Sequence, residues 1–217
     1  METITGAEVD GALSTLGWRV VAGAARIRYA TGDFATGVRL VQQVAVAAEE
    51  AQHHPDVDLR YGVVQVSLST HAVDGLTQAD VDLARTVSRL AQELGVAVAS
   101  APPQTLDVAI DALDIASVRP FWEAVLGYVQ DGDGALVEPD SLGLYVWFQQ
   151  MDAPRPQRNR IHLDINVPED LARARVEAAV AAGGVLVTDR WAPAWWVLAD
   201  AEGNEACIST WRPSGQG

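Results

Sequence analysis

The sequence contains no lysine, one cysteine and four histidines among its 217 residues. The absence of lysine excludes Schiff-base chemistry and the lysine-dependent phosphate-binding loop. The single Cys207 excludes an internal disulfide framework, which fits a reducing compartment. Fifteen arginines against twenty-nine acidic residues leave a net charge of −14, and this balance repels phosphate backbones and anionic lipid surfaces. We therefore expect neither nucleic-acid binding nor membrane-surface binding.

No segment has the pattern of a secretory signal or a membrane span. The N-terminal stretch METITGAEVDGALSTLGW carries acidic residues where a signal peptide is basic, and it lacks an apolar centre. Apolar runs elsewhere stay well short of the roughly 18 residues that a spanning helix needs. We expect a soluble, cytoplasmic protein.

The composition changes near the Pro-Pro pair in GVAVASAPPQT (95–105). Before this stretch lie three histidines but only one tryptophan, Trp18, whereas residues 105–217 hold six of the seven tryptophans and only His162. A linker of small residues and proline is typical of a domain boundary. We predict two domains, residues 1–100 and residues 105–217.

Two amphipathic helices are predicted in the first domain. One follows Asp33 as its N-cap, and its apolar residues recur at helical spacing. These residues are Phe34, Val38, Val41, Ala45 and Ala48. The other helix opens on the capping-box pair Thr77 and Asp80 and continues to Leu94.

Strands are predicted before and between these helices. GWRVV and ARIRYA are short strand patterns, and residues 61–71 alternate between apolar and polar side chains. In that alternation Val64, Val66 and Leu68 share one face, which places His71 on the polar face of the strand. The pattern predicts an α+β domain in which helices cover one face of an antiparallel sheet.

The second domain repeats one order of elements. LDVAIDAL predicts a strand, SVRPFWEAVLG a helix, and GALVEP and LGLYVWFQQ two further strands. The same order recurs in NRIHLDINV, EDLARARVEAAVAAGG, VLVTDR, WWVLAD and EACIST. Two successive β-α-β-β-β units predict an internally duplicated domain.

Histidine is concentrated in one stretch, as the adjacent pair His53-His54 and as His71. Imidazole has an ordinary pKa of about 6.5, so it can give or take a proton near neutral pH. The pair follows a predicted helix that Pro55 ends, where a histidine can also serve only as a C-terminal cap. Adjacent histidines diverge by about 100° on a helix, and no cysteine is near, so the pattern disfavours a zinc site.

The spacing around these histidines resembles the signature of the pterin-4a-carbinolamine dehydratase family. The positions that carry it, separated by three, five, nine and eight residues, are Glu49, His53-His54-Pro55, Tyr61, His71 and Asp80. The stretch THAVDGLTQAD is similar to the family between the last histidine and the aspartate. The resemblance covers roughly residues 5–98.

This resemblance implies a hydro-lyase that removes water from a 4a-hydroxytetrahydropterin, such as 4a-hydroxytetrahydrobiopterin, to give the quinonoid dihydropterin. Because the hydroxyl leaves as water and the pterin N5 loses a proton, the reaction needs an acid and a base. The resemblance implies His53, His54 and His71 as the catalytic histidines, with His54 leading the proton transfer. Which histidine is the acid and which the base stays open. The pterin is the substrate, and no cofactor is expected.

The same resemblance implies roles for the surrounding residues. Glu49 and Asp80 would orient the imidazoles, although Glu49 can also be a solvated helix residue and Asp80 only a cap. The residues implied in substrate binding are Trp18, Tyr61 and Thr70. A buried structural role is the alternative for Trp18. A homo-oligomer is expected.

In the second domain, LDVAIDALDIASVRPFWEAVLGY, RIHLDINV and LADAEGNEACI resemble the glyoxalase-like members of the vicinal-oxygen-chelate superfamily, over residues 105–211. Metal-dependent members take His or Gln, Glu, His and Glu from four strands. The corresponding strands here offer Asp107, Gln149, His162 and Cys207, and Glu205 lies two residues before the last of them. Since only His162 is of the expected type, we expect no tightly bound metal, with His162, Glu205 and Asp107 as the remaining candidates.

Two roles are possible for four tryptophans of this domain. They either line an apolar pocket for a flat ligand or belong to the core. They are Trp147, Trp191, Trp195 and Trp196.

Together these patterns predict a dehydratase in the first domain and a binding or auxiliary module in the second. One alternative is a non-catalytic dimerisation or partner-binding protein, a role that members of the dehydratase family can also have. Another is a metal-dependent lyase or dioxygenase that works through the second domain. The complete set of acid–base residues favours the dehydratase.

Overall fold

The computed structural model describes residues 2–140, 143–154 and 162–210. The chain divides into two units, residues 1–105 and residues 106–217. Each unit has its own hydrophobic core, the first built from residues up to Val96 and the second from residues after Leu106. In the described part of the chain, no helix combines the length and the apolar character of a membrane span.

The N-terminal unit consists of three α-helices, two 3₁₀ turns and short strands. In chain order they are β1 (Thr3–Ile4), α1 (Gly6–Leu13), η1 (Ser14–Leu16), β2 (Arg19–Val21), β3 (Ala24–Ala30), α2 (Phe34–Ala51), β4 (Asp56–Arg60), β5 (Val63–Leu68), η2 (His71–Val73), β6 (Leu76–Thr77), α3 (Gln78–Glu93) and β7 (Ala97–Val98).

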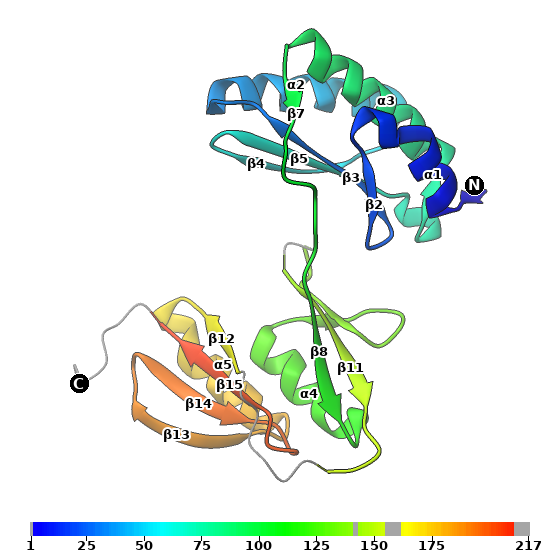
Figure 1. Cartoon of the computed structure of the whole chain (residues 1–217). Coiled ribbons are helices and arrows are strands. Elements are labelled where there is room, and N and C mark those ends of the chain that lie inside the picture. Colours follow the sequence, from blue (N-terminus) through cyan, green and yellow to red (C-terminus); the bar gives the residue numbers. More distant parts are fainter. Residues whose placement is uncertain (1, 141–142, 155–161, 211–217) are drawn as a thin grey trace. The chain divides into compact units, whose positions relative to one another are not determined.

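The main sheet of this unit is antiparallel, with the strand order β2-β3-β5-β4, and β7 pairs with β3. Figure 1 shows α2 and α3 on the same side of this sheet. Ile27, Val64 and Val66 on the strands are buried in one core with Leu40 of α2 and Val87 of α3. The predicted α+β architecture, with helices on one face of an antiparallel sheet, is confirmed.

The buried face of helix α2 matches the predicted one only in part: Ala48 is buried and Val41 packs against the core, as predicted. The buried residues are Gly37, Leu40, Val44 and Ala48, whereas Phe34 is 50 % exposed and Ala45 is exposed. The reason is Gly37: a side-chain carbon there would lie 2.5 Å from Leu59 Cδ1, so the helix approaches β4 at a residue without a side chain. A prediction based on the spacing of apolar side chains does not detect this contact, because glycine has no side chain.

Strand β5 ends earlier than predicted. It stops at Leu68, and His71 opens the 3₁₀ turn η2 instead of lying on the polar face of a strand. The cause is the local pairing of Thr70 with Gly75, which closes a tight turn before β6. The predicted capping box of Thr77 and Asp80 at the start of α3 is confirmed.

The C-terminal unit contains two β-α-β-β-β repeats. Its elements are β8 (Asp107–Ala112), α4 (Ile115–Leu126), β9 (Val129–Gln130), β10 (Leu136–Val137), β11 (Tyr145–Gln150), β12 (Leu163–Asn166), α5 (Glu169–Ala181), β13 (Val185–Trp191), β14 (Trp195–Ala199) and β15 (Glu205–Ser209). The predicted strands 142–150 and 159–167 include residues 142 and 159–161, which lie outside the described residues.

The two repeats have the same topology, which confirms the predicted duplication. The sheets run β8-β11-β10-β9 and β12-β15-β14-β13, so the first strand of each repeat pairs with its last strand. Both of these pairs are parallel. Phe121 of α4, Ala179 of α5 and Ile208 of β15 belong to one core, so the repeats share a single hydrophobic interior.

We predict that the two units fold independently when the chain is cut between Ser100 and Thr105, because no core cluster of the described residues contains side chains from both. Each fragment should unfold cooperatively in urea. A cut between Tyr61 and Gly62 is the matched control: it also falls in a turn, but it separates β4 from β5 and should abolish folding of the N-terminal fragment. A disordered 1–100 fragment would contradict the prediction.

Candidate active site

The adjacent histidines follow the end of α2 because the chain turns sharply there. Gln52 adopts the left-handed conformation with φ 49°, and the backbone N–H of His53 donates to the carbonyl of Ala48. Pro55 then lies at the start of an extended segment that enters β4. The helix therefore ends with the histidine pair outside its last turn.

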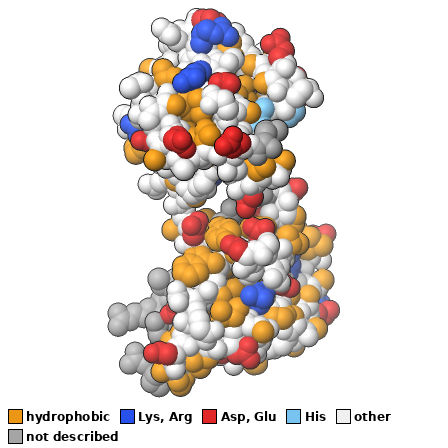
Figure 2. All heavy atoms as spheres, turned by 90° about the vertical axis from the view of Figure 1, so that its right-hand side faces the viewer, with side chains coloured by type: hydrophobic (Ala, Val, Ile, Leu, Met, Phe, Trp, Pro, Cys, Tyr) orange, Lys and Arg blue, Asp and Glu red, His pale blue; other side chains and the backbone are white. Residues whose placement is uncertain are grey.

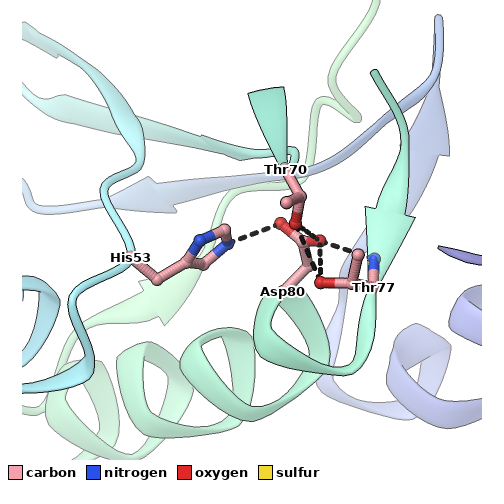
Figure 3. A network of polar contacts seen from close by, with 4 residues as sticks. All are labelled: His53, Thr70, Thr77 and Asp80. Carbon is pink, nitrogen blue, oxygen red and sulfur yellow. Dashed lines mark hydrogen bonds and ion pairs between the residues drawn. The ribbon is translucent and has the colours of Figure 1, made fainter. Parts of the chain in front are cut away.

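His53 forms the best-buried polar contact of the cluster. Its Nε2 lies 2.7 Å from Oδ1 of Asp80, and the two side chains are 12 % and 0 % exposed. Figure 3 shows the imidazole directed at the carboxylate, which comes from the first turn of α3. The contact joins two segments that are 27 residues apart in the sequence.

The second oxygen of Asp80 is held by donors from the turn before α3. Oδ2 accepts hydrogen bonds from Thr70 Oγ1 at 2.8 Å, from the Thr77 backbone N–H at 2.7 Å and from Thr77 Oγ1 at 3.2 Å. The hydroxyls of Thr70 and Thr77 are 2.8 Å apart (Figure 3). A buried carboxylate is stable when its oxygens are satisfied in this way.

This arrangement sets the orientation of the His53 ring. An ionised carboxylate only accepts hydrogen bonds, so Nε2 of His53 carries the proton that faces Asp80. In the neutral imidazole Nδ1 is then the atom able to accept a proton. The buried network thus holds one defined proton acceptor at the end of α2.

His54 has a different environment. Its Nε2 lies 3.2 Å from Oε1 of Glu49, and these side chains are 60 % and 72 % exposed. Figure 2 shows histidine side chains at the surface of the N-terminal unit. An exposed imidazole beside a carboxylate can exchange protons with a bound molecule.

His71 is exposed and follows Thr70 directly in the chain. Because the Thr70 hydroxyl is bonded to Asp80, the backbone leading to His71 is attached to the same network as His53. The structure therefore groups His53 with Asp80 and the two threonines in a buried set, and His54 with Glu49 in an exposed pair. His71 adjoins the buried set through Thr70.

Two of the residues predicted to bind substrate are buried. Trp18 is 1 % exposed, and its indole N–H donates to Ser88 Oγ at 2.9 Å inside the core. Thr70 is 5 % exposed, and its hydroxyl is bonded to Asp80 and Thr77. A role of either side chain in substrate binding stays a prediction. Tyr61 is 77 % exposed in the turn between β4 and β5 and remains a prediction.

The sequence reasoning missed the contribution of Thr77 to this network. Its signal was present, because the capping box predicts that the Asp80 carboxylate accepts the Thr77 backbone N–H. The pattern does not show that the same carboxylate also accepts hydrogen bonds from two hydroxyl groups and faces a histidine.

In the C-terminal unit the expected metal candidates lie on different sheets. Asp107 belongs to β8 in one sheet, whereas His162 immediately precedes β12 in the other and Glu205 begins β15. Among the described residues, the ligand atoms that lie within 4.8 Å of one another belong to His162, Asp164 and Cys207. Asp164 was not among the predicted candidates, although it follows His162 at the two-residue spacing of a strand.

The four tryptophans do not line one pocket. Trp147 lines a cavity of about 320 Å³ in the first repeat, and Trp191 and Trp195 stack on each other with ring centroids 5.2 Å apart. Trp196 packs against the core. Neighbouring residues on a strand face opposite sides, so Trp195 and Trp196 cannot share a surface.

The cavity beside Trp147 has polar groups at its edge. Tyr145 donates from its hydroxyl to Asp133 Oδ2 at 2.5 Å. This hydrogen bond raises the pKa of Tyr145 to about 12 and lowers the pKa of the Asp133 carboxyl. At neutral pH the pair is therefore a phenol bonded to a carboxylate, and neither group is a proton-transfer candidate.

Both units are similar to known protein families. Residues 2–90 match the family model for pterin 4 alpha carbinolamine dehydratase, and residues 107–209 match the model for a glyoxalase-like domain. The similar proteins include two that carry the name "Putative pterin-4-alpha-carbinolamine dehydratase". The protein of Mycolicibacterium smegmatis is 41 % identical over 42 % of this chain and 97 % of its own length. The protein of Herpetosiphon aurantiacus is 43 % identical over 34 % of this chain and 77 % of its own length.

A solved structure is also similar to the N-terminal unit. It is the transcriptional coactivator/pterin dehydratase of Brucella melitensis, which is 33 % identical, with a TM-score of 0.39. The match covers 42 % of this chain and 99 % of that protein.

We predict that Asp80→Asn lowers the free energy of unfolding of the N-terminal unit by about 2–4 kcal/mol, because an amide replaces a carboxylate that receives charge-assisted hydrogen bonds in a buried site. Amide hydrogen exchange in β5 and α3 measures this loss within the unit. Asp82→Asn makes the same change two residues away, where the side chain is 65 % exposed, and should cost less than about 0.5 kcal/mol. Equal losses in both variants would contradict a special role for the network.

Proposed function

We propose, because the chain belongs to the pterin-4-alpha-carbinolamine dehydratase family, that its N-terminal unit removes water from a 4a-hydroxytetrahydropterin, specifically 4a-hydroxytetrahydrobiopterin. The observation that carries the proposal is the pairing of each adjacent histidine with a carboxylate, His53 with buried Asp80 and His54 with exposed Glu49. The two imidazoles therefore have distinct environments, as separate proton-transfer roles require.

The proposed reaction breaks the bond between C4a of the pterin and its hydroxyl oxygen. The hydroxyl receives a proton and leaves as water, and N5 gives up its proton, so the product is the quinonoid dihydropterin. Two proton transfers account for the whole change in atoms, with no net oxidation. For this reason the proposed reaction needs no cofactor, and the pterin is its substrate.

We assign the leading proton transfer to His54. Its 60 % exposure makes the ring accessible to a bound pterin, and its Nε2 lies 3.2 Å from Glu49 Oε1. His53 is oriented by Asp80 and is the partner in acid–base work or substrate orientation. The exposed His71, at the start of η2, is the third member of the set. The division into acid and base among the three stays open.

The C-terminal unit is proposed as a binding or auxiliary module. The cavity of about 320 Å³ in its first repeat supports binding of a small molecule. We also propose that the protein works in the cytoplasm as a homo-oligomer. A monomeric mass for the full chain in sedimentation at micromolar concentration would refute the proposed homo-oligomer.

The purified full chain should accelerate the loss of 4a-hydroxytetrahydrobiopterin above its spontaneous rate. The carbinolamine is generated in the assay mixture, and its decay is then followed by ultraviolet absorption. Decay at the spontaneous rate, with a folded protein, would refute the proposed activity and favour the partner-binding alternative.

His54→Ala should lower dehydratase turnover by at least about a hundredfold, because general acid–base catalysis contributes about 10²–10⁴ in rate. The side chain is exposed at a helix end, so the circular dichroism spectrum should stay unchanged. Glu50→Gln is the matched control: Glu50 is an exposed residue of α2 next to Glu49, and its loss should leave turnover within about twofold of the parent. Near-normal turnover of His54→Ala would remove His54 from the leading role.

A further inference from the structure

We propose that the cavity beside β11 in the C-terminal unit binds a pterin ring whose N5 carries no proton, with Arg119 as the residue that recognises this nitrogen. The cavity has a volume of about 320 Å³. The proposal deepens the binding role of the C-terminal unit by naming a class of ligand. The ring chemistry follows from the side chains of the cavity, and the choice of a pterin over a related heterocycle rests on the proposed dehydratase reaction.

Arg119 of α4 lines this cavity as a charged side chain without an acceptor. Its Nε is buried and has no hydrogen-bond partner, and no described residue forms a hydrogen bond or an ion pair with the guanidinium. Its Cζ lies 5.6 Å from the centroid of the Phe148 ring. Such a contact uses the face of the guanidinium, whereas the N–H donors lie in its plane. Because buried donors are rarely left unpaired, a ligand that supplies acceptors fits here.

The turn between β9 and β10 leaves space beside these donors. Gly134 has φ 90°, a conformation that favours glycine. A side-chain carbon at this residue would lie 3.2 Å from Nη2 of Arg119. Glycine therefore lets the turn pass close to the guanidinium without filling the space next to it.

The opposite charge in the cavity comes from Asp107, the first residue of β8, which is the neighbour of β11 in the sheet (Figure 1). Its side chain is exposed, and no described residue donates a hydrogen bond to it. Asp133 also lines the cavity, but the Tyr145 hydroxyl and the Ala135 backbone N–H already donate to its two oxygens. Asp107 is therefore the carboxylate that is available to a ligand.

An aromatic side chain gives the cavity a surface for a flat ligand. Trp147 of β11 lines it and is 39 % exposed. An exposed indole can stack on a heterocycle, and a stacked ring keeps its edges available for hydrogen bonds in its own plane. The cavity thus combines a stacking surface with a donor, Arg119, and an acceptor, Asp107.

These groups match the two edges of a pterin. An arginine fork recognises a ring carbonyl together with the neighbouring ring nitrogen, as it does with O6 and N7 of guanine, and the pterin equivalents are O4 and N5. A carboxylate accepts a hydrogen bond from an exocyclic amino group, which is the 2-amino group of a pterin. The chain has a net charge of −14 and the cavity has two carboxylates, so phosphate-bearing guanine nucleotides are disfavoured.

The protonation of N5 decides which pterin fits. Arginine only donates hydrogen bonds, so Arg119 can pair with N5 only when this nitrogen carries no hydrogen. In the proposed dehydratase reaction the substrate has a proton on N5 and the product has lost it. The cavity therefore selects the dehydrated form over the carbinolamine, and the C-terminal unit is a product-binding module.

Titration of pterin into the ¹⁵N-labelled full chain, followed by NMR, tests the proposal at this cavity. The amide signal of Gly134 and the indole signal of Trp147 report on the cavity and not on the N-terminal unit. Both should shift and reach saturation. Tetrahydropterin has a proton on N5, and lumazine has a carbonyl in place of the 2-amino group. Each should bind at least about tenfold more weakly than pterin.

Arg119→Gln should weaken pterin binding at least about tenfold, with an unchanged circular dichroism spectrum. Arg190→Gln is the matched control: Arg190 also stacks on an aromatic ring, with its Cζ 3.8 Å from the centroid of Trp191, but it does not line the cavity. The affinity should be unchanged in this variant. Asp107→Asn should reduce the preference for pterin over lumazine, because an amide accepts less well than a carboxylate.

Unshifted Gly134 and Trp147 signals, equal affinities for pterin and tetrahydropterin, or unchanged affinity in Arg119→Gln would overturn the proposal. Tighter binding of guanosine than of pterin would also overturn it. A parent chain that binds pterin at this cavity but shows no dehydratase turnover would refute the proposed reaction and leave the ring-binding site in place.

Discussion

The carboxylate of Asp80 is the group on which the candidate active site depends. It is fully buried, it begins α3 as part of a capping box, and it receives hydrogen bonds from two threonines of the preceding turn. The same group holds His53, which comes from the far end of α2. One side chain therefore joins a helix start, a turn and a histidine, so that folding of the N-terminal unit and orientation of the imidazole have a common cause. The cost of burying an acid is offset because each of its oxygens has a partner.

Much of this site could be predicted from the sequence, because its parts are local. The end of α2 is signalled by Pro55, and the capping box by Thr77 and Asp80. The long-range contacts could not be predicted in the same way. Periodicity predicted Phe34 and Ala45 in the buried stripe of α2, whereas the helix approaches β4 at Gly37, which has no side chain. Alternation likewise extended β5 to His71, although the turn between Thr70 and Gly75 ends the strand first.

In the C-terminal unit the repeat was predictable, whereas the grouping of side chains was not. The duplicated order of strands and helices is visible in the sequence, and the structure confirms it in two sheets of equal strand order. The sequence pattern did not indicate Asp164 as a neighbour of His162 and Cys207. The register that pairs Asp164 with Cys207 is a property of the folded sheet. The tryptophans separate for a similar reason, since alternation directs Trp195 and Trp196 to opposite faces.

If the buried Asp80 carboxylate orients His53, the imidazole of His53 has one defined tautomer. Nitrogen-15 NMR of the histidine rings, at a mildly alkaline pH where imidazoles are neutral, measures this directly. We predict that His53 carries its proton on Nε2, hydrogen-bonded to Asp80, while exposed His54 shows a mixture of tautomers in exchange. A proton on Nδ1 of His53, or a freely exchanging mixture there, would contradict the claim that the buried carboxylate sets the acid–base chemistry of the site.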